Sequence, residues 1–135
     1  MGDVIAQRPV LLIAAVFSRH QAALDWARAR LVDRWGHISL ESSRFDHRET
    51  TYYEASMGAD LQKVFFASEV LIDPGVLPAL KLEANRWEEE YRALGHHPEA
   101  RPLNIDPGYL TEAKLVLAST KDRDHRIYLA EGIFA

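Results

Sequence analysis

The run Val10-Leu11-Leu12-Ile13-Ala14-Ala15-Val16-Phe17 decides the fold of this chain, because all eight of its side chains are apolar. An unbroken apolar run of this length, rich in branched side chains, is typical of a strand that is buried on both faces. A helix that crosses a bilayer needs about 20 apolar residues, so this run is too short to be one. We therefore expect a central strand here, within a single domain that spans residues 1–135.

Two amphipathic helices are predicted from apolar residues that recur at steps of three and four. The first covers residues 19–35 and begins with a capping box formed by Ser18 and Gln21. The second covers residues 74–94 and begins at Asp73-Pro74, a favourable N-cap followed by a favourable first helical residue. We expect both helices to pack on the same face of a sheet.

Three further strands are predicted over residues 37–45, 64–72 and 102–105, with an ordered loop over residues 46–60. The resulting order is β-α-β-β-α-β, which predicts an α+β domain with a ferredoxin-like antiparallel sheet. An extra C-terminal helix over residues 107–121 and a final strand over residues 126–134 complete the predicted fold.

The composition excludes several classes of function. The chain has 16 basic and 20 acidic residues, a net charge of −4, and therefore no general affinity for nucleic acid is expected. It has no cysteine, which excludes disulfides and thiolate metal sites and fits a cytoplasmic location. The phosphate-binding loops G-x-x-x-x-G-K-[ST] and G-x-G-x-x-G are absent, so we expect no cofactor. His96-His97 has no companion ligands, so we expect no metal. Because the longest apolar run is too short to cross a bilayer, we also expect no membrane partner.

The densest group of polar residues lies in the predicted C-terminal helix and just after it. Lys114 and Lys121 fall on one helical face, near the hydroxyls of Ser119 and Thr120 and the guanidinium of Arg126. These groups suit an anionic ligand such as a phosphate or a carboxylate. The alternative is an ordinary solvent-exposed helix face, for which lysines are equally suited.

Other residues are assigned to the same hypothetical site. Tyr52 and Tyr53, beside the hydroxyl of Thr51, offer rings for stacking and hydroxyl donors, with Tyr109 as a third tyrosine. His125 is the candidate acid or base if the domain is catalytic. The preferred hypothesis is a domain that binds, or binds and converts, a small anionic ligand, and the alternative is a non-catalytic interaction or self-assembly module.

The predicted strand over residues 126–134 is largely apolar on both faces and contains neither proline nor lysine. Such a strand at a sheet edge invites pairing with a second chain. We therefore expect a homodimer formed through this strand.

Three blocks of the sequence resemble an uncharacterised bacterial family, domain of unknown function 4416. They are NIDPGYL at 104–110, AKLVLASTK at 113–121 and HRIYL at 125–129, and the earlier segments YYE at 52–54 and LIDP at 71–74 fit as well. The resemblance extends over residues 9–135 and implies no activity. It implies that this chain is a short or truncated form, since members of the family continue past Phe134 into further β structure.

Overall fold

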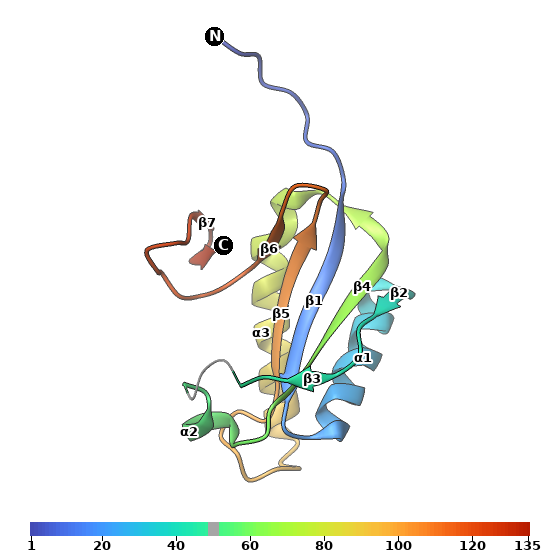
Figure 1. The fold of residues 1–135 in the computed structure, drawn as a ribbon, viewed down its shortest axis with the longest axis vertical. Coiled ribbons are helices and arrows are strands. Elements are labelled where there is room, and N and C mark those ends of the chain that lie inside the picture. The colour runs from blue at the N-terminus through green and yellow to red at the C-terminus, as the bar shows by residue number, and fades with distance from the viewer. Residues whose placement is uncertain (49–51) are drawn as a thin grey trace.

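The computed structural model describes residues 1–48 and 52–135 and shows an α+β domain (Figure 1). In the described part of the chain, the main sheet comprises β1 (Val10–Ser18), β2 (Ile38–Glu41), β3 (Phe45–Asp46), β4 (Gln62–Ile72), β5 (Asn104–Leu110) and β6 (Leu115–Leu117). The helices are α1 (Gln21–Trp35), α2 (Glu54–Met57) and α3 (Leu77–Ala93), and a 3-10 turn, η1 (Pro74–Val76), precedes α3. A separate hairpin pairs β7 (Tyr128–Ala130) with β8 (Ile133–Phe134).

The apolar run forms the central strand, as predicted. The sheet order is β2-β4-β1-β5-β6, with β3 paired to β4, and every neighbouring pair is antiparallel. β1 therefore lies between the two longest remaining strands of the sheet, and its residues 12–18 are all buried. Strands β4 and β5 pair with both edges of β1, and its side chains are buried on both faces, which is why the run needs no polar side chain.

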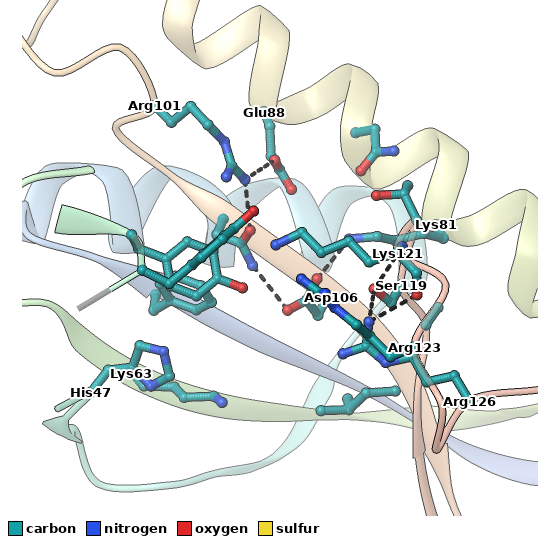
Figure 2. Close-up of a pocket in the computed structure, with 18 residues that line it drawn as sticks. His47, Lys63, Lys81, Glu88, Arg101, Asp106, Ser119, Lys121, Arg123 and Arg126 are labelled. Carbon is teal, nitrogen blue, oxygen red and sulfur yellow. Dashed lines mark hydrogen bonds and ion pairs between the residues drawn. The ribbon is translucent and has the colours of Figure 1, made fainter. Parts of the chain in front are cut away.

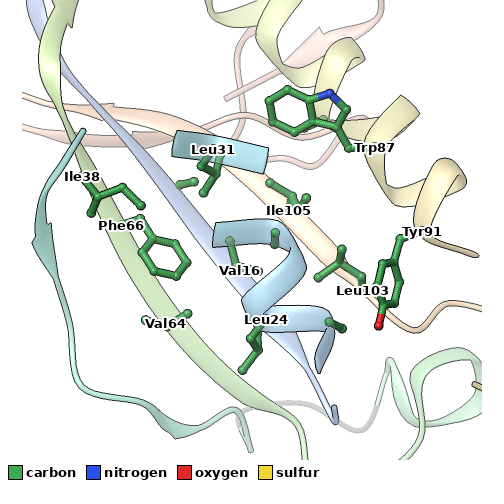
Figure 3. Packing of buried hydrophobic residues seen from close by; sticks show 14 residues of the cluster. Val16, Leu24, Leu31, Ile38, Val64, Phe66, Trp87, Tyr91, Leu103 and Ile105 are labelled. Carbon is green, nitrogen blue, oxygen red and sulfur yellow. The ribbon is translucent and has the colours of Figure 1, made fainter. Parts of the chain in front are cut away.

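Helices α1 and α3 pack on one face of this sheet (Figure 3). Their apolar faces meet the inward side chains of β1, β4 and β5 in one core cluster, in which Leu24, Leu31, Trp87 and Tyr91 are the largest helical members. The ring centroids of Trp35 and Trp87 are 6.0 Å apart, so the two helices contact each other as well as the sheet. Both predicted amphipathic helices are confirmed.

The predicted capping box of α1 is wrong. Ser18 Oγ accepts the backbone N–H of His20 and donates to the carbonyl of Pro102, while Gln21 donates to Asp25 at 2.7 Å. Ser18 is fully buried on β1, so its hydroxyl satisfies backbone groups of the adjoining loops instead of the end of the helix.

The predicted helix over residues 107–121 is also wrong. Residues 104–110 form β5, whose pairing with β1 runs without a break from Phe17↔Asn104 to Leu11↔Leu110, and the chain then turns back as β6. The two Asp-Pro-Gly segments thus have different structures: Asp73 caps the turn before α3 through the N–H of Gly75, whereas Asp106 lies inside β5.

Proline is tolerated in β5 because of the side on which its nitrogen lies. The carbonyl of Pro107 faces β6 and accepts the N–H of Ala118 at 3.0 Å. In an antiparallel ladder the N–H and C=O of one residue point to the same side, so the missing N–H of Pro107 interrupts no bond to β1.

The predicted strand over residues 126–134 is a hairpin instead. Glu131 and Gly132 both have positive φ, 54° and 78°, which is the geometry of a two-residue hairpin turn. β8 pairs back onto Ser119, and Ile133 packs with Leu77 and Ala118 in a second apolar cluster. The C-terminal strand therefore lies outside the main sheet and does not form its edge.

The remaining predicted elements need smaller corrections. The strand predicted over residues 37–45 is divided into β2 and β3, and the strand predicted over residues 102–105 is the beginning of the longer β5. The loop predicted over residues 46–60 includes α2, and Thr51 lies outside the described residues. Within the described ranges, no helix is both long enough and apolar enough to cross a membrane.

Gly108 is the position at which the pairing of β5 with β6 is most sensitive to substitution. A Cβ atom there would lie 2.1 Å from the carbonyl oxygen of Val116 and 2.8 Å from a methyl carbon of Leu117. We expect Gly108→Ala to lower the free energy of unfolding by about 1–3 kcal/mol, since the strands must separate to admit the methyl group.

Chemical denaturation measures this loss, and Gly2→Ala is the matched control because a Cβ at Gly2 meets no atom within 4 Å. Equal stability of Gly108→Ala and the parent protein would contradict the close approach of β6.

Candidate functional site

A pocket of about 570 Å³ opens beside β5, at the part of that strand which β6 does not cover (Figure 2). β6 pairs only with Gly108, Tyr109 and Leu110, so among the described residues no strand lies on that side of residues 104–106. The pocket is lined by side chains from β1, β4, β5 and α3, by residues around α2, and by the segment 117–126. It therefore joins segments that are distant in the sequence.

Helix α3 completes the hydrogen bonding of β5 at this open edge. Glu88 accepts the backbone N–H of Ile105 at 3.0 Å, and the ammonium of Lys81 donates to the carbonyl of Ile105 at 3.2 Å. Lys81 and Glu88 are seven residues apart, two turns of the helix, so both project from one face of α3 toward the strand. Two side chains thus replace the neighbouring strand that β5 lacks here.

A connected polar network extends from these two residues across the pocket. Lys81 also donates to Asp106 at 2.6 Å, and Asn104 donates to the second oxygen of Asp106 at 3.0 Å. Arg101 then donates to Asn104 at 2.9 Å and lies 3.5 Å from Glu88. The network begins at Lys81 and ends at Glu88, both on α3, so its charged members hold one another in place.

Burial in this network shifts the pKa of the Glu88 carboxyl group. Burial raises its pKa above the ordinary value of 4.5, and this effect outweighs the charge of Lys81, the bond from Ile105 and the charge of Arg101, all of which lower the pKa. The Glu88 side chain keeps only 14% of its surface exposed.

The segment after β6 contributes the positive end of the pocket. Arg126 donates to the Oγ of Ser119 at 2.7 Å and to the carbonyl of Lys121 at 3.0 Å, which closes the segment into a loop. Lys121 and Arg123 line the pocket beside it. Among the described residues none of these three cations forms an ion pair with a carboxylate.

Aromatic side chains form the opposite end. The ring of Phe17 lies 4.6 Å from that of His47 and 5.1 Å from that of Tyr53, and Tyr52 packs edge-on against Tyr53 at 5.1 Å. The ammonium of Lys121 reaches across the pocket and lies 4.0 Å from the ring centroid of Tyr52.

The structure brings together six of the residues assigned from the sequence: Tyr52, Tyr53, Ser119, Thr120, Lys121 and Arg126 all line this pocket. The predicted helix that carries Lys121, with Ser119 and Thr120 at its end, is wrong, because these residues lie in a loop. That they bind a ligand remains a prediction.

Three assigned residues are not part of the pocket lining. Lys114 is exposed in the turn between β5 and β6, and Tyr109 packs with the apolar cluster around Leu77 and Ile133. His125 is exposed in the loop before β7, and its role as acid or base stays a prediction.

The sequence reasoning missed the framework of the pocket, namely Lys81, Glu88, Arg101, Asn104 and Asp106. None of these five side chains is assigned to a site from the sequence. One signal was available: Lys81 follows Leu77 by four residues and precedes Ala84 by three, at a spacing otherwise occupied by buried side chains.

The loop over residues 95–103, which delivers Arg101 to the pocket, is held to the start of α1 by a cluster of ionisable groups. His20 pairs with Glu99 at 2.8 Å and stacks on His97 with ring centroids 3.7 Å apart. His97 in turn lies 2.7 Å from the hydroxyl of Tyr91. Within the described residues, no three His, Asp or Glu side chains are grouped so that they would hold a metal ion.

Comparison with known proteins identifies the family. Residues 8–135 match the family described as domain of unknown function (DUF4416). The chain belongs to this family. No curated protein and no solved structure matches the chain, so the family carries no activity or ligand over to this pocket.

The His20–His97 stack predicts an acid-sensitive fold. Burial, together with the neighbouring His20, lowers the pKa of His97 below its ordinary value of 6.5, so the unfolded chain binds this proton more readily than the folded one. The stabilisation is present above pH 6.5 and is lost as the pH falls through the folded pKa. We expect the melting temperature to fall between pH 7.5 and 5.5, and to fall less in His97→Gln.

The exposed His125 provides the control, because His125→Gln should keep the full decrease of the parent protein. The hydrogen bond from His20 lowers the pKa of Glu99, which places the effect of Glu99 below pH 4.5 and outside this window. An identical decrease of the melting temperature in His97→Gln and the parent would contradict the claim that His97 causes the acid sensitivity.

Proposed function

We propose that this domain binds a small anionic ligand, a phosphate or a carboxylate, in the pocket beside β5. The observation that supports this most is the convergence of Lys121, Arg123 and Arg126 on one cavity without a carboxylate partner among the described residues. Cations that repel one another and lack counter-charges are the usual arrangement for recognising an anion.

The distribution of charge supports the same proposal. The whole chain has more acidic than basic residues, 20 against 16. The described lining of the pocket reverses this ratio, with the basic residues Lys63, Lys81, Arg101, Lys121, Arg123 and Arg126 against the acidic residues Glu88 and Asp106. A local excess of positive charge on an otherwise acidic protein favours binding of an anion at this site.

Binding is the primary proposal, and conversion of the ligand is an extension of it. Asp106 and Glu88 are the carboxylates in the described lining, and both are engaged by the Lys81 network. A proton-transfer role for either would need a ligand that displaces one of these bonds. The proposal therefore rests on recognition alone.

Substitution of the unpaired cations tests the proposal. A thermal-shift screen of phosphates, nucleotides and sugar acids should reveal compounds that raise the melting temperature with concentration, because such ligands bind only the native state. We expect Lys121→Ala combined with Arg123→Ala to reduce the affinity of such a compound at least tenfold, since hydrogen bonds to charged groups contribute about 1.5–3 kcal/mol each.

Lys114→Ala is the matched control: it removes one exposed cation from the same C-terminal region, outside the pocket lining, and should leave binding unchanged. An equal loss in Lys114→Ala would indicate a general effect of charge, and a screen without any stabilising compound would contradict the proposal.

Self-association is the second candidate, and exposed apolar side chains favour it. Ile127, Tyr128 and Leu129 have exposed fractions of 74%, 58% and 40%. They lie on or beside β7, which pairs with β8 on one side and has no described strand on the other. A second copy added at this edge would cover both the backbone and the side chains.

We expect Leu129→Lys to convert such a dimer to a monomer in light scattering across a dilution series. Ile133 is unsuitable for this test because it is only 1% exposed and belongs to the core. A parent protein that is monomeric at high micromolar concentration would exclude the dimer.

We further propose that the framework is ferredoxin-like. The order β2-β4-β1-β5 supports this, because the predicted β-α-β-β-α-β unit places its first and third strands at the centre. β3, β6 and the hairpin are then additions to that unit. The absence of cysteine supports the cytoplasm as the proposed location.

A further inference from the structure

The pocket presents three kinds of chemistry in a fixed order along its length. Figure 2 shows His47 at one end, Arg123 and Arg126 at the other, and Asp106 between them. The order is therefore an aromatic wall with Lys63 beside it, a carboxylate bonded to Lys81, and a group of cations without carboxylate partners among the described residues. A ligand that fills the whole pocket must match all three.

The aromatic wall suits a planar ring. In the order His47, Phe17, Tyr53, Tyr52 the rings form a continuous series in which neighbouring centroids are 4.6–5.1 Å apart. The ammonium of Lys121 lies 4.0 Å from the ring of Tyr52 and 5.1 Å from that of Tyr53, which shows that these rings are accessible from the pocket.

The interaction free energies favour replacement of the contact between Lys121 and Tyr52 by stacking of a ligand ring on Tyr52. An exposed cation–π contact contributes about 0.5–1 kcal/mol, whereas stacking of a nucleobase on an aromatic side chain contributes about 1–3 kcal/mol. The long, flexible side chain of Lys121 then becomes free to join Arg123 and Arg126 around an anion.

Asp106 suits hydroxyl groups at the middle of the ligand. Its two carboxylate oxygens accept one hydrogen bond each, from Lys81 and from Asn104, and 26% of its side chain stays exposed. A carboxylate has about four acceptor positions, so acceptor capacity remains for a sugar hydroxyl. The two protein bonds hold the carboxylate in place for such a contact.

We propose that the anionic ligand of this domain is a nucleoside monophosphate. Its base stacks on the ring of Tyr52, beside which Tyr53 stands edge-on. Its ribose hydroxyls donate to Asp106, and its phosphate is held by Lys121, Arg123 and Arg126. The volume of about 570 Å³ lies within the range of pockets for ligands of this size. This inference rests on the proposed function and adds the identity of the uncharged part of the ligand.

The absence of a glycine-rich phosphate loop is consistent with this arrangement. Such loops bind phosphate through successive backbone N–H groups. Here the cationic side chains of the segment after β6 perform that role, and the bond of Arg126 to Ser119 fixes the segment in position.

Isothermal titration calorimetry at constant ionic strength tests the inference with AMP, CMP, GMP, UMP, ribose 5-phosphate and inorganic phosphate. We expect the best nucleotide to bind roughly 5- to 150-fold more tightly than ribose 5-phosphate, the ratio that corresponds to stacking of one base. Tyr52→Leu should remove most of this advantage without changing the affinity for ribose 5-phosphate. Tyr52 is 60% exposed, so the substitution does not disturb the core.

Tyr128→Leu is the control, since Tyr128 is an equally exposed tyrosine that does not line the pocket. Equal affinities for the nucleotides and ribose 5-phosphate, with binding lost in Lys121→Ala, would overturn the nucleotide inference and keep the anion-binding function. Binding of none of the six compounds would contradict the nucleotide inference and also the proposal that the site binds a phosphate.

Discussion

The hydrogen bonds of the Ile105 backbone are the constraint on which the fold and the pocket both depend. Ile105 is completely buried, yet its N–H and C=O point to the side of β5 that β6 does not reach. Each of these groups would cost about 1–3 kcal/mol if left without a partner. Glu88 and Lys81 supply the partners, so closing the sheet draws two opposite charges from α3 into the interior.

The charges introduced in this way determine the chemistry of the pocket. Lys81 requires a counter-ion and receives Asp106, while Glu88 is approached by Arg101, whose loop is held by the His20–Glu99 pair. One side of the pocket is therefore a rigid network that belongs to the core. The cationic side belongs to the segment after β6, which is attached through Ser119 to Arg126 and β8. A ligand would lie between a rigid wall and a segment with few apolar contacts.

The sequence predicts an element correctly where regular apolar spacing or an unbroken apolar run determines it. It fails where the structure depends on a contact with residues far away in the sequence. β1, α1 and α3 follow from apolar spacing alone. Residues 107–121 were wrongly predicted as helix because Asp73-Pro74-Gly75 and Asp106-Pro107-Gly108 look identical locally, and only the pairing with β1 distinguishes them. Tyr52, Tyr53, Lys121 and Arg126 were assigned to one site, but Lys121 was placed on a helix that does not exist. Lys81 and Glu88 were missed because their partner is a backbone group 17 to 24 residues away.

Amide hydrogen exchange at Ile105, measured by NMR in the parent protein and in Glu88→Ala, tests the central claim most directly. The account predicts that the Ile105 amide is strongly protected in the parent and loses protection selectively in the variant, while the amides of β1 keep theirs. An Ile105 amide that stays equally protected in Glu88→Ala would contradict the claim that a side chain of α3 closes this edge of the sheet.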